Sequence, residues 1–71
     1  SLIMDQDAFQ RSIRKLLKSV GVTTQQEIEK AVQQGIDAGR LKGDEQLPAR
    51  VTVTVDGIDL TLTFDGDITL E

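Results

Sequence analysis

The chain has 71 residues, of which 38% are hydrophobic and 28% charged, and its formal net charge at pH 7 is −4. That length allows one domain with a small core, because chains of this size bury only about 60% of the surface that they expose when unfolded. The sequence contains no histidine, cysteine, tyrosine or tryptophan, which excludes disulfide bonds, soft metal sites and the usual pairing of a base with a nucleophile.

Neither a signal peptide nor an apolar run of the roughly 20 residues needed to cross a membrane is visible in the sequence. We therefore expect a cytoplasmic protein with no membrane association. A single domain is expected over residues 4–70, with residues 1–3 and Glu71 either derived from an expression vector or disordered.

A first amphipathic helix is predicted from Asp5 to Val20. Its apolar positions recur at the spacing of one helical face: Phe9, Ile13, Leu16, Leu17 and Val20. Asp5 and Asp7 suit the N-terminal end, where a carboxylate caps free amides and offsets the helix dipole. Gly21 is predicted to end this helix in a left-handed conformation.

A second helix is predicted to begin at Thr24, because Thr24 and Glu27 have the spacing of a capping box. Its inner face contains five positions, Ile28, Ala31, Val32, Gly35 and Ile36. A glycine inside a helix costs about 1 kcal/mol, so Gly35 predicts a close approach by another element, either the first helix or the sheet. Gly39 is the expected end of this helix.

Residues 40–50 are predicted to be a connection pinned to the core by Leu41 and Leu47. The hydrophobic period then changes to two, which indicates strands. Asp56-Gly57 predicts a two-residue hairpin turn that pairs Val55 with Ile58. The same register pairs Val53 with Leu60 and Val51 with Leu62, and it places the threonines on the opposite, solvated face.

A third strand is predicted at Ile68–Leu70, after a three-residue turn formed by residues 64–66 or 65–67. The expected fold is therefore α+β in the order α-α-β-β-β. A two-helix hairpin would pack on one face of a three-stranded antiparallel meander, in two layers.

Four basic residues, Arg11, Arg14, Lys15 and Lys18, form a stripe on the polar face of the first predicted helix. Such a stripe could contact nucleic acid, and residues 19–32 resemble the turn of a helix-turn-helix. The apolar register is nevertheless misplaced, with Glu27 and Lys30 where that motif packs, so nucleic-acid binding is the alternative reading. Four hairpin acids, Asp56, Asp59, Asp65 and Asp67, are not expected to converge on a metal or to act in catalysis.

The chain resembles a family of short bacterial proteins of unknown function. Three segments carry the resemblance: "IRKLLKSVGVTTQQEIEKAV", "GRLKGDEQLPARVTVTV" and "DGDITLE". The resemblance spans nearly the whole chain and implies that the connection at residues 40–50 belongs to the domain. It implies no activity, cofactor or site.

Charge is unevenly distributed. Residues 1–42 hold seven Lys/Arg and five Asp/Glu residues, a net +2, whereas residues 43–71 hold one and seven, a net −6. We expect a non-enzymatic protein without cofactor that binds another protein or a second copy of itself, because its core is small and its sheet has free edges. A pocket for a small molecule or ion near the connection is a third reading.

Overall fold

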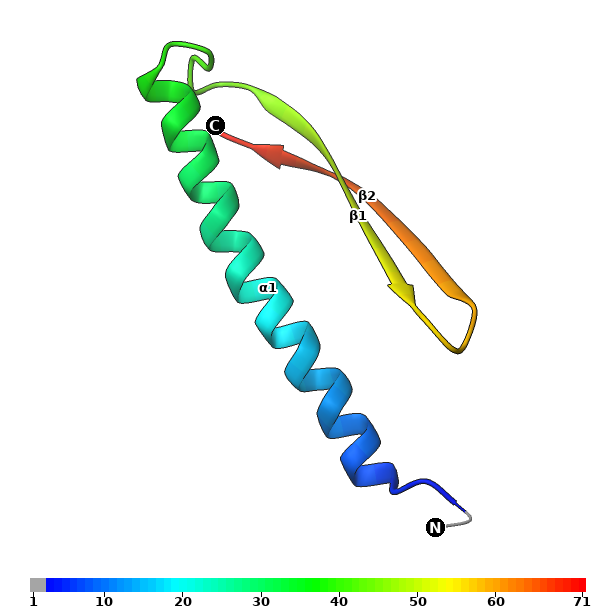
Figure 1. Ribbon diagram of the computed structural model, residues 1–71. Coiled ribbons are helices and arrows are strands. Elements are labelled where there is room, and N and C mark those ends of the chain that lie inside the picture. The colour runs from blue at the N-terminus through cyan, green and yellow to red at the C-terminus, as the bar shows by residue number, and fades with distance from the viewer. Residues whose placement is uncertain (1–2) are drawn as a thin grey trace.

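The structure, a computed structural model, describes residues 3–71, which form one long helix followed by one β-hairpin (Figure 1). Helix α1 spans Gln6–Asp37, strand β1 spans Gln46–Val55 and strand β2 spans Leu60–Thr69. The α+β class is correct, but the predicted helix hairpin and three-stranded meander are wrong. The expectations for Ser1 and Leu2 lie outside the described residues.

Helix α1 runs through the segment that was expected to be a turn. Gly21 and Thr24 are both helical, so neither the predicted helix end nor the capping box with Glu27 forms. A break there would leave four amides and four carbonyls without helical partners. Continuing the helix through one glycine costs only about 1 kcal/mol.

The apolar pattern also favours one helix, because it continues across Gly21 with an eleven-residue repeat. Such a repeat keeps one face of a nearly straight helix apolar. Its members are Phe9, Ile13, Leu17, Val20, Thr24, Ile28, Ala31 and Gly35. On an ideal helix these positions lie within about 100° of one another.

The two ends of α1 form as the sequence predicts. The side chain of Asp5 accepts a hydrogen bond from the amide of Ala8 at 3.1 Å, which caps the N-terminal end. At the other end Gly39 has a φ of +77° and donates its amide to the carbonyl of Ile36. The left-handed conformation of Gly39 therefore ends the helix.

The hairpin register differs from the prediction by two residues. Val55 pairs with Leu60 and Val53 with Leu62, because the connection is a four-residue turn, residues 56–59. Gly57 and Asp59 both have positive φ in this turn, at 89° and 57°. A shift of two residues preserves the faces of the strands, so the predicted separation of apolar and threonine faces is correct.

The predicted third strand is wrong because β2 continues through it. Gly66 pairs with Ala49 inside the ladder and is not in a turn. Ile68 pairs with Leu47, and the amide of Leu70 extends the ladder by donating to the carbonyl of Glu45 at 3.0 Å. Strand β1 accordingly begins at Gln46, inside the segment that was expected to be a connection.

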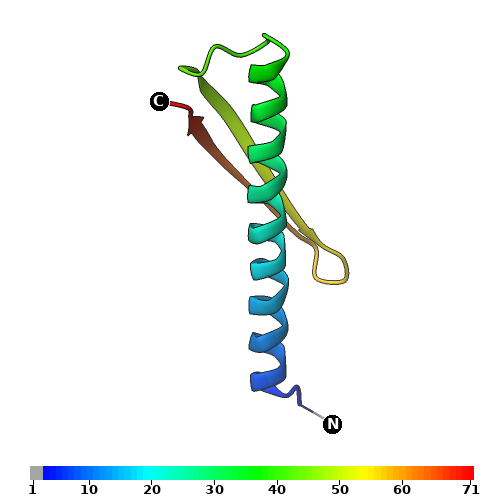
Figure 2. The same cartoon turned by 90° about the vertical axis from the view of Figure 1, so that its left-hand side faces the viewer.

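The expected two-layer packing does not form. The hairpin runs back along α1 but diverges from it toward the turn at residues 56–59, and α1 extends beyond that turn in both views (Figures 1 and 2). We call residues 28–50 and 65–70 the closed end, and residues 6–27 and 51–64 the open end. Gly35 is the only fully buried residue that the structure describes, so residues 3–71 contain no apolar core.

Candidate interaction surface

The open end of α1 presents an apolar stripe that no other element of the described chain covers. Phe9 is 46% exposed, Leu17 is 56% exposed and Val20 is 46% exposed. Side chains of this type normally gain roughly 1.5–3 kcal/mol each from burial. Contact between this exposed stripe and another apolar surface would therefore be favourable, because it would remove both from water.

The hairpin presents a second apolar face of the same kind. Its ladder places Val51 opposite Phe64 and Val53 opposite Leu62, with the side chains of each pair on one face. Phe64 is 57% exposed and Leu62 is 45% exposed. Both faces of the open end of the hairpin are therefore accessible, although one of them is apolar.

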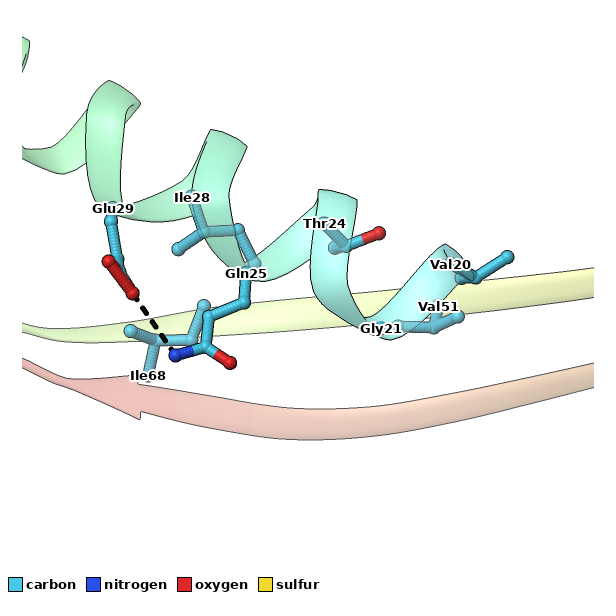
Figure 3. Close-up of a pocket in the computed structure, with 8 residues that line it drawn as sticks. All are labelled: Val20, Gly21, Thr24, Gln25, Ile28, Glu29, Val51 and Ile68. Carbon is cyan, nitrogen blue, oxygen red and sulfur yellow. Dashed lines mark hydrogen bonds between the residues drawn. The ribbon is translucent and has the colours of Figure 1, made fainter. Parts of the chain in front are cut away.

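A groove of about 480 Å³ lies between α1 and the hairpin, near the middle of the helix (Figure 3). Val51 and Ile68 line it from the strands, and Val20 and Ile28 are among the residues that line it from α1. Gly21 also faces this groove, and a Cβ atom built on Gly21 would meet no atom within 4 Å. The groove is mostly apolar and open to solvent, which suits a side chain or helix of another polypeptide.

The closed end is where the hairpin is attached to the helix. A Cβ atom on Gly35 would lie 2.8 Å from Cδ1 of Leu41, so a close approach occurs at Gly35, but the approaching element is the connection and not the first helix or the sheet. Leu41 and Leu47, the predicted anchors, are both half-buried. The amides of Arg40 and Leu41 donate to the carbonyl of Gly35 at 2.9 and 3.1 Å.

The carboxylate of Glu45 fixes the shape of the connection. Its Oε2 accepts from the amide of Lys42 at 2.8 Å, and its Oε1 accepts from the amides of Gly43 and Asp44 at 2.9 and 3.2 Å. The hydrogen bond from Lys42, followed by that from Gly43, lowers the pKa of Glu45 below its ordinary value of 4.5. These amides already have a partner, so they do not form an anion site for the third reading.

The four basic residues of the predicted stripe all lie on α1 and are exposed: Arg11, Arg14, Lys15 and Lys18. None of them forms an ion pair with another described residue; the one salt bridge in residues 3–71 joins Arg50 to Asp65. The helix-turn-helix reading loses its structural basis, because residues 19–24 form no turn. The stripe itself is present as a solvated helix face.

The hairpin acids lie in separate places. Asp56 and Asp59 belong to the turn, whereas Asp65 and Asp67 lie along β2. Within residues 3–71 no three His, Cys, Asp or Glu side chains are grouped closely enough to hold a metal ion. No helix in that part of the chain has the length and hydropathy of a membrane span.

Sequence reasoning missed the groove and the open faces, because it assumed that the helix turned back at Gly21. The signal that could have revealed them is the eleven-residue apolar repeat, which passes Gly21 without a change of face. A helix that keeps one apolar face over 32 residues is longer than a ten-residue hairpin can cover.

Comparison with known proteins gives a family but no activity. No curated protein and no solved structure matches the chain. A family model described as a family of unknown function, DUF6494, matches residues 4–71, which include the three segments on which the resemblance was based. The chain therefore belongs to this DUF6494 family of unknown function.

Proposed function

We propose that this chain is a non-enzymatic protein-interaction module that binds another polypeptide through its open end. One observation carries the proposal: no large apolar side chain in residues 3–71 is buried, while two apolar faces and the groove between them are accessible. Apolar patches of this extent on small proteins are characteristic of interaction surfaces.

The absence of histidine and cysteine from the sequence supports a binding role over a catalytic one. Glu45 is the described carboxyl group whose pKa is clearly shifted, and three backbone amides hold its carboxylate. Three of the roughly four lone-pair positions of this carboxylate are therefore occupied by amides of its own loop.

Site-specific photo-crosslinking in the cells that make the protein tests this proposal. A photo-reactive benzophenone side chain at Leu17 or Leu62, on the two apolar faces, should form covalent adducts with a polypeptide. The same group at Gln26, on the opposite side of α1, or at Thr63, on the threonine face of β2, should give several-fold less adduct.

Adducts at Leu17 and Leu62, whether with this chain or with a different protein, support the proposed function. Equal yields at all four positions, or none at any, contradict it. Adducts with nucleic acid alone at these positions would favour the alternative reading of the basic stripe.

A further inference from the structure

The exposed surface of the chain is too large for a stable monomer. The accessible area is 6430 Å², whereas a folded protein of this mass exposes roughly 4400 Å². The radius of gyration is 17.1 Å, compared with roughly 11 Å for a compact domain of this length. The missing burial is therefore roughly 2000 Å² per chain, the contribution of one subunit to an obligate dimer.

A second copy would supply that burial. A compact dimer of this chain should expose roughly 7200 Å², and two separate chains together expose twice 6430 Å². The difference, between roughly 5000 and 6000 Å² in total, lies at the upper end of the range for obligate homodimers. No third component is needed to reach the surface of an ordinary compact protein.

The two uncovered faces are matched in length and in chemistry. The open part of α1 up to Val20 is about 22 Å long, and the open part of β1, Val51–Val55, is about 17 Å long. Both are apolar, and each lacks a cover in its own chain because the hairpin diverges from the helix toward its turn (Figure 1).

The charge distribution selects the orientation. The open end of α1, residues 6–27, holds four Lys/Arg and two Asp/Glu, a net +2, whereas the open end of the hairpin, residues 51–64, holds two Asp and no Lys/Arg, a net −2. An arrangement that places helix on helix would bring like charges together, whereas helix on hairpin brings opposite charges together in both halves of a twofold-symmetric pair.

The outer edge of β1 is a poorer candidate for the contact than the apolar face. In an antiparallel ladder every second residue of a strand forms hydrogen bonds with the partner strand, and the residues between them point their backbone groups outward. Glu45 bonds to Leu70, which directly follows the partner strand, so residue 48, three positions later, points its backbone nitrogen away from β2. That residue is Pro48, which has no amide proton, and an added strand would therefore lose a hydrogen bond there.

We propose that this chain forms an antiparallel homodimer in which the open half of α1 of each copy packs on the apolar face of the other copy's hairpin and closes the groove at Gly21. This inference rests on the proposed function and names the second copy as its partner. Gly21 leaves room at the centre of the groove for the close approach of the second chain.

Light scattering after size-exclusion chromatography is the first measurement, between about 1 and 100 µM protein. The expected mass is twice 7.8 kDa. Gly21→Glu introduces a good helix former where a side chain meets nothing in the single chain, but it buries an unpaired carboxylate in the dimer. It should raise the dissociation constant by roughly 100-fold or more. Gln26→Glu makes the same charge change on the far side of α1 and should leave the constant unchanged.

Cysteine crosslinking then tests the orientation, since the chain has no cysteine of its own. A mixture of the Ile13→Cys and Leu62→Cys variants treated with a short bismaleimide should give the mixed dimer in several-fold excess over either self-linked product. Gln26→Cys mixed with Thr63→Cys, on the polar faces, is the matched control and should not crosslink.

A monomer at every concentration overturns the inference, as does a dimer in which the Ile13→Cys variant links mainly to itself. Retention of the dimer in Gly21→Glu also overturns it, because the groove would then lie outside the interface. If the purified chain is a monomer but benzophenone at Leu17 captures another protein in cells, the proposed function stands and this inference alone falls.

Discussion

The open end of this chain holds about twice as many large apolar side chains as the closed end, yet it leaves nearly all of them exposed, whereas the closed end covers most of its own at least in part. At the closed end Leu41 lies against Gly35, and three amides converge on the carboxylate of Glu45. At the open end Phe9 and Phe64 remain about half exposed. The two ends therefore differ in burial because only the closed end has local contacts that hold the hairpin against the helix. The number of apolar side chains does not explain the difference.

The local contacts at the connection are sufficient to turn the hairpin back along α1, but they do not bury the apolar face of the hairpin. Apart from the hairpin ladder and the Arg50–Asp65 pair, the hydrogen bonds that shape the closed end join residues that are close in sequence. Closing short loops costs little entropy, so such contacts form readily within one chain. The open end has no such neighbours, and its burial depends on a surface that comes from elsewhere.

The largest expected effect comes from removing the carboxylate that holds the closed end together. Glu45→Ala deletes the acceptor of three amide hydrogen bonds at once. The connection should lose its shape, and the closed end should come to resemble the open end. Hydrogen exchange should show roughly tenfold or greater loss of protection at the amide of Leu70, which pairs with residue 45.

Acid titration of the same residue provides the control. The pKa of Glu45 is lowered in the folded chain, so its contribution to stability is complete above the ordinary value and is lost as the pH falls through the folded value. Glu45→Gln should therefore differ most from the unmodified chain near neutral pH and converge with it once the pH lies below the lowered pKa of Glu45. A constant difference at all pH values would contradict this assignment.

Two glycines of α1 provide the next test of the difference between the ends. In the dissociated chain, Gly21→Ala, at the open end, should raise the free energy of unfolding by about 1 kcal/mol through helix propensity, since its Cβ meets no atom of its own chain. Gly35→Ala gains the same propensity but forces Leu41 aside, which costs about 2 kcal/mol. Denaturant unfolding at one fixed protein concentration should therefore separate the two variants by about 2 kcal/mol.

If both alanine variants are stabilised equally, Leu41 moves without cost and the closed end is not tightly packed. The Gly35→Ala substitution would then act only through helix propensity. Of the contacts at the closed end, only those of Glu45 would remain to explain why the two ends differ.

The sequence predicts the local features of this fold well because they depend on near neighbours. The cap at Asp5, the stop at Gly39 and the alternating faces of the strands are all correct. Each follows from hydrogen-bonding needs or side-chain periodicity within a few residues.

The sequence does not predict the features that depend on a balance between competing local signals. Gly21 and Thr24 have the chemistry of a helix end and a helix start. The continuous helix is nevertheless favoured, because it keeps the backbone hydrogen bonds that a break would lose and pays only the low helix propensity of one glycine. Gly66 follows an aspartate as in a turn, yet it pairs with Ala49 because β1 extends far enough back to meet it. The open surface could not be foreseen once two helices were assumed.

The smallest effect is expected at the border between the two ends, where Nε of Arg50 donates to Oδ1 of Asp65 across the strands at 2.8 Å. The two side chains are 70% and 66% exposed, and solvent-exposed pairs of this kind contribute only about 0.2–1 kcal/mol. A double-mutant cycle with Arg50→Gln and Asp65→Asn should give a coupling of about 0.5 kcal/mol that decreases in 0.5 M salt, because mobile ions screen exposed charges. A coupling well above 1 kcal/mol that is insensitive to salt would mean that the pair is buried in solution. The Arg50–Asp65 pair would then be covered in solution, and a second chain that covers the open end would have to extend as far as this pair.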